Sequence, residues 1–181
     1  MTLPKNYNGM GILEAVLIGV LISVLMVVFM GRILNLSLAV EREAMQQTLI
    51  NLNSALNIEA LTLVIQNNEE GLASWEGGNP MKLLNPPPIK YKGSFSQADA
   101  MKQVPGSWFF DEGQAQLIYR INNVKQFAGG RAIPERVRFS VKPIFDDQNN
   151  DGRKNSDERY TGLKLIALDE YQWLSNVVNQ D

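Results

Sequence analysis

The chain has no cysteine and no histidine among its 181 residues. Without cysteine it has no disulfide, no thiol nucleophile and no thiolate metal site. Without histidine it lacks the side chain that most often serves as a general base or as a transition-metal ligand. Its net charge is −2 and it has no basic run, so contact with nucleic acid is not indicated. Its carboxylates form no recognisable catalytic arrangement, and the sequence therefore predicts a protein that is not an enzyme.

Charge is also missing from a long stretch near the N-terminus, from Ala15 to Gly31. As a helix, residues 11–31 would be about 30 Å long, just enough to cross a bilayer. Glu14 lies within this segment, and a carboxylate at the membrane centre costs about 2.5–3.5 kcal/mol, so it needs a partner. Cleavage after Gly9 would create an amino group on Met10, one helical turn from Glu14. That group would neutralise the carboxylate, within the chain or in an adjacent subunit.

Two other targeting segments also contain an apolar run. A secretory signal peptide is cut after its apolar region at small residues, but here the run continues from Phe29 to Arg32 without an Ala-x-Ala pattern. A plain signal anchor has no use for Glu14. The carboxylate therefore favours a removed leader, residues 1–9, over either alternative.

Beyond Arg32 the apolar pattern becomes one-sided. Leucine and methionine recur at steps of three, four and seven, as in an amphipathic helix, at Leu34, Leu38, Met45, Leu49, Leu52 and Leu56. We expect the polar residues on the other faces, namely Glu41, Arg42, Glu43, Gln46, Gln47, Asn51 and Asn53. Residues 10–66 are thus predicted to form one helix, about 85 Å long, that ends before Gly71.

Residues 67–181 are predicted to form a β-rich domain. Glycine and proline dominate residues 72–106, where one helical stretch is expected at 97–102. Strands are predicted at 116–121, 136–142 and 163–168, with Val137, Phe139 and Val141 on one face. The carboxylate pairs 111–112 and 169–170 are expected at solvated strand ends. The predicted fold class is α+β: a long N-terminal helix, half membrane-spanning and half amphipathic, packed on a C-terminal antiparallel sheet.

The short leader, Gly9, Glu14 at the fifth position after the cut, the apolar segment and the C-terminal sheet together resemble type IV pilins and type II secretion pseudopilins. The hairpin 108–119 with its downstream acidic loop is most similar to minor pilins of the mannose-sensitive haemagglutinin type. The resemblance implies that a prepilin peptidase cuts after Gly9 and methylates the new N-terminus of Met10. It also implies assembly from the inner membrane into a helical filament with the N-terminal helices at its core.

Several positions depart from the family's pattern. Met10 replaces the usual phenylalanine, Gly11 a frequent threonine, and Gly31 a helix-bending proline, and the C-terminal disulfide of many major pilins is missing. These departures favour a minor pilin or pseudopilin over a shaft subunit.

The resemblance implies that the partners are other pilins or pseudopilins, the prepilin peptidase, the assembly platform of a pilus or type II secretion system, and the membrane. The expected location is the inner membrane, crossed once, with residues 67–181 in the periplasm or on a surface pilus. A membrane-anchored periplasmic binding module that does not polymerise is the alternative.

The acidic stretch 147–158 follows the calcium-loop pattern D-x-N-x-D-G, five residues, then E. In such loops oxygens from alternate residues wrap one cation, a glycine makes the turn and the last glutamate gives two oxygens. The predicted Ca²⁺ ligands are the side chains of Asp147, Asn149, Asp151, Asn155 (directly or through water) and Glu158, and the carbonyl of Arg153. Flanking strands and the charges of Arg153 and Lys154 count against calcium, and a polar hairpin loop is the alternative.

Overall fold

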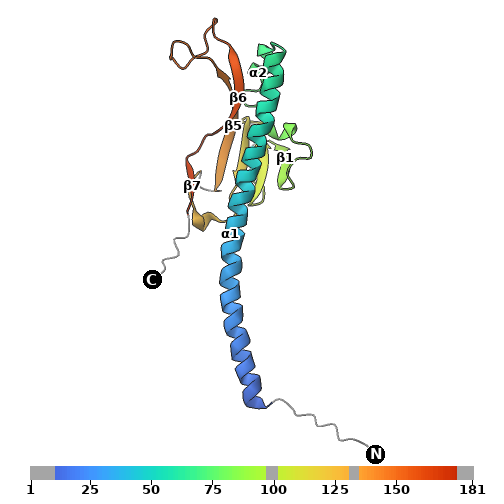
Figure 1. Ribbon diagram of the computed structural model, residues 1–181, viewed down its shortest axis with the longest axis vertical. Helices are drawn as coiled ribbons and strands as arrows, with labels where there is room; N and C mark the ends of the chain where they lie inside the picture. The colour runs from blue at the N-terminus through green and yellow to red at the C-terminus, as the bar shows by residue number, and fades with distance from the viewer. Residues whose placement is uncertain (1–10, 97–101, 131–134, 175–181) are drawn as a thin grey trace, which may run out of the picture. The chain divides into compact units, whose positions relative to one another are not determined.

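The computed structural model describes residues 11–96, 102–130 and 135–174 (Figure 1). The chain divides into two compact units, residues 1–40 and 41–181, and each is described separately. The predicted cleavage residues Gly9 and Met10 lie outside the described residues, as does most of the helical stretch predicted at 97–102.

Helix α1 (Ile12–Ile65) begins in the first unit and continues into the second. The sequence contains no proline between these bounds, so the backbone hydrogen bonds of a helix can continue without interruption. In the first unit every side chain from Ile12 to Met30 is exposed. The one hydroxyl in this apolar run, that of Ser23, donates to the carbonyl of Gly19 at 2.8 Å and is satisfied within the helix.

Two segments of α1, Ile12–Gly31 and Ala39–Ile65, are long and apolar enough to cross a membrane. The second segment supplies core residues of the globular unit, so its apolar character already has a use in the fold.

The second unit is built on a five-stranded sheet in the order β1-β2-β3-β5-β6. Its strands are β1 (Tyr91–Phe95), β2 (Ser107–Asp111), β3 (Gln116–Arg120), β5 (Arg136–Phe145) and β6 (Tyr160–Ala167). The pairs among β2, β3, β5 and β6 are antiparallel, as predicted. Strand β1 pairs with β2 in parallel, so the sheet is mixed and not purely antiparallel.

Several short elements complete the second unit. A two-stranded antiparallel sheet joins β4 (Phe127–Gly129) to β7 (Tyr171–Trp173). Helix α2 (Glu69–Ser74) follows α1, and the 3₁₀ turns are η1 (Pro80–Leu83) and η2 (Val124–Gln126). Asn68 caps α2 by accepting from the backbone N–H of Gly71 at 2.8 Å.

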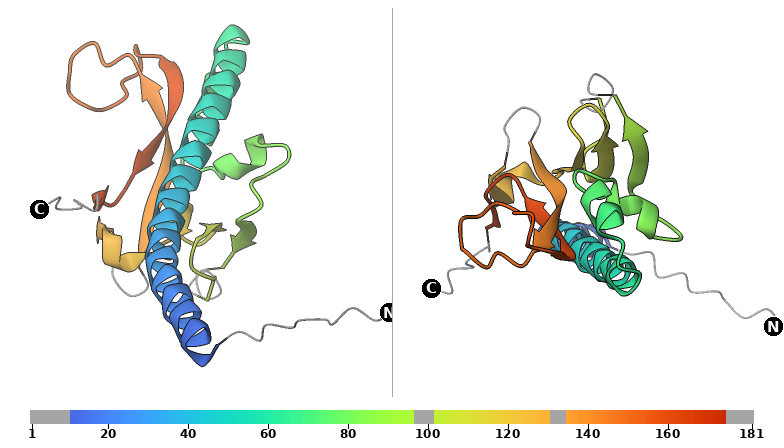
Figure 2. Two further views of the ribbon diagram at one scale, coloured as in Figure 1. Left: turned by 60° about the horizontal axis from the view of Figure 1, so that its bottom comes forward. Right: turned by 90° about the horizontal axis from the view of Figure 1, so that it is seen from above.

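The part of α1 in the second unit packs on one face of the sheet (Figures 1 and 2). The predicted alternation in β5 is confirmed, because Val137, Phe139 and Val141 are all buried. The main core joins the following residues of α1 and the sheet: Met45, Leu52, Leu56, Ala60, Leu63, Trp108, Phe110, Leu117, Tyr119, Val137, Phe139, Val141, Leu163 and Leu165. A smaller cluster of Phe109 and Ile118, with Phe95 against it, covers the opposite face of the sheet.

Candidate functional site

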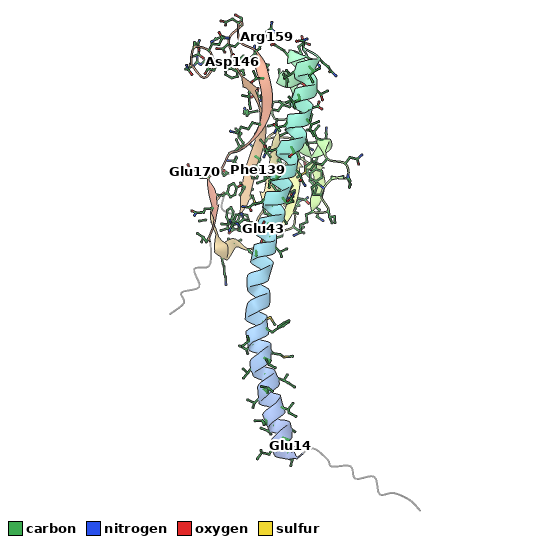
Figure 3. The ribbon with its side chains drawn as sticks, viewed as in Figure 1. Glu14, Glu43, Phe139, Asp146, Arg159 and Glu170 are labelled. Carbon is green, nitrogen blue, oxygen red and sulfur yellow. The ribbon has the colours of Figure 1, made fainter. Side chains whose placement is uncertain are left out.

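The predicted calcium loop joins β5 to β6 and lies at the same end of the second unit as α2 (Figure 1). Its base is closed by a hydrogen bond from the backbone N–H of Asp146 to the carbonyl of Arg159 at 3.0 Å, and both residues are labelled in Figure 3. The loop therefore closes like a hairpin, between strands, as the sequence indicated.

The first half of the loop turns around Asp147. Its carboxylate accepts from the backbone N–H of Asp151 at 3.2 Å and of Gly152 at 2.8 Å. Gly152 has φ +72°, a left-handed conformation that glycine adopts without strain. The turn predicted at Gly152 is therefore present.

Three candidate ligands converge on one point in this loop. Asp151 Oδ2 accepts from the side-chain amides of Asn149 and Asn155, each at 3.2 Å. Hydrogen bonds from the backbone N–H of Arg153 and from the Asn155 amide lower the pKa of the Asp151 carboxyl, so it is charged at neutral pH. If the Asn155 amide rotated by half a turn, its oxygen would take the place of its nitrogen. Asn155 would then present an oxygen at the point where the three side chains converge.

Glu158 closes the loop from a buried position, with 3% of its surface exposed. One carboxylate oxygen accepts from the backbone N–H of Gln148 at 3.1 Å and the other from that of Asn155 at 2.9 Å. Each carboxylate oxygen has two acceptor sites, so these hydrogen bonds leave capacity for a cation.

In the described part of the chain, no three carboxylate, histidine or cysteine side chains lie close enough together to hold a metal ion. The other predicted ligands of the loop are asparagine side chains and the Arg153 carbonyl, and calcium accepts both kinds of oxygen. Calcium binding at these residues stays a prediction.

One of the two positive charges that counted against calcium is engaged outside the loop. The Lys154 ammonium lies 3.9 Å from a carboxylate oxygen of Glu69 in α2 and 4.9 Å from the ring centroid of Tyr160. Arg159 Nε lies 3.8 Å from the other Glu69 oxygen. The sequence pattern gave no signal for Glu69, because it precedes the loop by more than seventy residues.

Glu41 was expected on a polar face of the helix, and this expectation is wrong. It is 4% exposed, and its carboxylate accepts from the Tyr119 hydroxyl at 2.9 Å and from the backbone N–H of Asn122 at 2.8 Å and of Asn123 at 3.0 Å. The side-chain amide of Asn123 also donates to it. These donors replace the water that a buried carboxylate has lost. We call Glu41, Tyr119, Asn122 and Asn123 the Glu41 clamp.

The Tyr119 hydroxyl is fixed as a donor in this clamp. Burial raises the pKa of Tyr119 well above its usual range, and the adjacent Glu41 carboxylate raises it further. The clamp could have been suspected from spacing, since Glu41 lies one turn before the buried Met45 on the same helical face.

Two other carboxylates expected at solvated strand ends are in fact engaged. Asp111 is buried and accepts from the backbone N–H of Gly113 at 2.9 Å, which stabilises the turn between β2 and β3. Asp169 accepts from the Arg138 guanidinium through two hydrogen bonds, at 2.7 and 2.9 Å. Both carboxylates therefore have structural roles.

The side of α1 that faces away from the core carries four exposed apolar residues among polar ones such as Gln47 and Ser54. Ile50, Ile58, Leu61 and Ile65 are 58%, 67%, 61% and 79% exposed, and they recur at steps of eight, three and four. Residues at such steps share one face of a helix. We call these four residues the outer stripe. Only the opposite stripe of the same helix, which includes Met45, Leu52 and Leu56, was predicted from the sequence.

Glu14 lies in the first turn of α1 (Figure 3). One of its carboxylate oxygens accepts from the backbone N–H of Gly11 at 3.1 Å. The carboxylate thus satisfies a backbone donor at the start of the helix, on the residue that directly follows Met10 in the sequence. Its predicted pairing with the Met10 amino group stays a prediction.

The described residues thus provide an apolar N-terminal helix, an α+β unit, an outer apolar stripe and an acidic loop rich in oxygen acceptors. No protein-family model matches the chain, and neither a curated protein nor a solved structure shows significant similarity to it.

Proposed function

We propose that the chain is a minor type IV pilin-like or pseudopilin-like subunit that is cut after Gly9 and takes part in assembling or priming a filament. The observation that carries this proposal is the outer stripe. Full burial of a leucine or isoleucine side chain stabilises by about 1.5–3 kcal/mol, so four exposed ones on one helical face favour a neighbouring apolar surface. A second copy of the same helix, or that of a related subunit, provides such a surface.

The first unit supports storage of the subunit in a membrane before assembly. Ile12–Gly31 is apolar on all sides and long enough to span, and Glu14 is its only charged residue. In the proposed arrangement the inner membrane holds this segment and residues 67–181 lie in the periplasm. The methylated amino group of Met10 then pairs with Glu14 of the same or the adjacent subunit.

We further propose that the loop 147–158 binds one Ca²⁺. Its predicted ligands are all oxygen atoms, which suits a hard cation, and Asn149, Asp151 and Asn155 already converge. When bound, the ion would neutralise loop carboxylates and link the ends of β5 and β6. In a chain without cysteine no disulfide can provide that link.

The decisive experiment for the pilin assignment measures processing. Co-expression with a prepilin peptidase should shorten the chain by its nine-residue leader and add a methyl group, as seen by intact mass. Gly9→Ala should stay full-length, and wild type expressed without the peptidase is the control. Retention of residues 1–9 under these conditions, or cleavage after Gly31, would exclude a pilin.

A second measurement separates the filament subunit from the anchored binding module. Filaments sheared from cells that carry the assembly machinery should contain the processed chain. A processed chain found only in the inner membrane fraction would favour the binding module.

A further inference from the structure

We propose that the Glu41 clamp is a conformational latch that sets where helix α1 is released from the globular unit. With the clamp closed, residues 41–44 stay on the sheet. With the clamp open, α1 is held only from Met45 onward. The inference concerns the second unit alone and does not rest on the proposed role in a filament.

The first turn of α1 in this unit has one attachment to the core. Among residues 41–45 only Glu41 and Met45 are buried, and the three residues between them are exposed. The next buried positions, Thr48 and Leu52, lie farther along the helix. The carboxylate of Glu41 is therefore the buried contact that holds residues 41–44.

Neutral groups hold this carboxylate. One oxygen accepts from the Tyr119 hydroxyl and the Asn122 backbone N–H, and the other accepts twice from Asn123. In the described part of the chain Glu41 forms no ion pair. The attachment is thus a set of four directional hydrogen bonds, which break together when the carboxylate withdraws.

The rest of the helix does not depend on this attachment. From Met45 onward, Leu52, Leu56, Ala60 and Leu63 pack on the sheet through apolar contacts. Opening of the clamp therefore needs no loss of the main core, which makes it a local two-state change. It would free four helical residues, about 6 Å of helix.

The absence of cysteine allows a direct test in the full-length chain. Spin labels at Arg42→Cys, near the far end of the freed segment, and Gln114→Cys, both exposed, would be the only labels, and pulsed electron spin resonance would measure the distance between them. Glu41→Gln keeps the side-chain shape but replaces one acceptor oxygen with a donor. The released population should rise on the order of tenfold, seen as a longer, broader distance distribution.

Glu43→Gln is the matched control, since Glu43 is exposed two residues away and should leave the distances unchanged (Figure 3). Tyr119→Phe removes a single donor and should give an intermediate released population, which also serves if Glu41→Gln does not fold. Equal distance distributions in the parent, Tyr119→Phe and any folded Glu41→Gln would overturn the proposal.

Discussion

Helix α1 in the globular unit and the loop 147–158 differ in the side chains that they leave without a role in the fold. In the helix these are apolar side chains, and in the loop they are carboxylates. The helix buries one apolar face in the core and exposes a second, the outer stripe. The loop has four carboxylates against two positive charges, and Lys154 is directed to Glu69. An exposed apolar surface is buried by contact with another apolar surface, and a cluster of carboxylates with excess negative charge attracts a cation. The two regions therefore support two different proposals, an apolar neighbour for the helix and a cation for the loop.

Truncating a side chain on the buried face of α1 should lower the free energy of unfolding much more than truncating one in the outer stripe. Leu52→Ala removes a side chain that is 0% exposed and should destabilise the folded unit by about 2–5 kcal/mol. Ile58→Ala acts on a side chain that is 67% exposed and should change the free energy of unfolding by no more than about 0.5 kcal/mol. Denaturant unfolding of the full-length chain measures both effects.

Filament incorporation should rank the two variants the other way round: Ile58→Ala should lower it more than Leu52→Ala does, provided that the Leu52→Ala chain still folds. Ile58→Ala should reduce it, because the residue faces the proposed neighbour. If Ile58→Ala were destabilising, or if it assembled like wild type, the outer stripe would not be a contact surface.

Replacing Glu14, the charged residue of the apolar segment in the first unit, separates membrane insertion from filament assembly. Glu14→Ala should insert as well as wild type or more favourably, because a carboxylate leaves the membrane; the gain should be smaller than the about 2.5–3.5 kcal/mol that applies at the bilayer centre, since Glu14 lies in the first turn of α1. It should nonetheless enter filaments poorly, since the Met10 amino group loses its partner. An insertion assay and the protein content of sheared filaments give the two readouts. Glu43→Ala, which lies outside the apolar run, is the control, and normal incorporation of Glu14→Ala would show that the pairing is dispensable.

Calcium should stabilise the full-length chain through the loop. Ligand at one hundred times its dissociation constant adds about 2.7 kcal/mol when it binds only the folded form. An affinity on the order of 10⁻⁴–10⁻³ M is expected for a loop that contains positive charges, so thermal melting is compared in millimolar Ca²⁺ and in chelator.

Asp147→Asn should abolish the calcium-dependent shift, because it removes a charged ligand. Asp157→Asn is the control, since this exposed carboxylate is outside the predicted ligand set. Identical wild-type melting curves with Ca²⁺ and with chelator would mean that the loop is a polar hairpin turn only.

Regular periodicity explains which parts of the fold could be predicted. The helical period located Met45, Leu52 and Leu56 in the core, and strand alternation located Val137 and Phe139. Strand β1 was missed because its sequence, Tyr-Lys-Gly-Ser-Phe, has a glycine at its centre and little apolar character. It forms by pairing with β2, which no local pattern encodes.

The contacts of the two sites depend on residues that are distant in the sequence. Glu41 was misassigned because its donors follow it by about eighty residues, so only its spacing from Met45 hinted at burial. The loop turn was predictable because Asp147 and Gly152 interact within six residues. The contact of Lys154 with Glu69 was not, because tertiary packing brings α2 to the loop.

Glu69 should tune the affinity of the loop for calcium by holding Lys154 away from the carboxylates. Exposed ion pairs are worth about 0–1 kcal/mol, so Glu69→Gln should weaken Ca²⁺ binding by at most about fivefold in calorimetric titration. Lys154→Gln should bind Ca²⁺ at least as tightly as wild type, since a competing positive charge is gone. In the Lys154→Gln background, Glu69→Gln should have little further effect, because the released ammonium is absent.

Glu70→Gln is the matched control for this double-mutant cycle, because Glu70 is the exposed neighbour of Glu69 in the same short helix and, within the described residues, forms no ion pair with the loop. An equal loss of affinity from Glu69→Gln in both backgrounds would show that α2 acts on the loop by a route other than Lys154, with Arg159 as the remaining contact of Glu69. Equal losses of Ca²⁺ affinity from Glu69→Gln and Glu70→Gln would instead indicate a general electrostatic effect. The carboxylates of α2 would then attract the cation together with those of the loop.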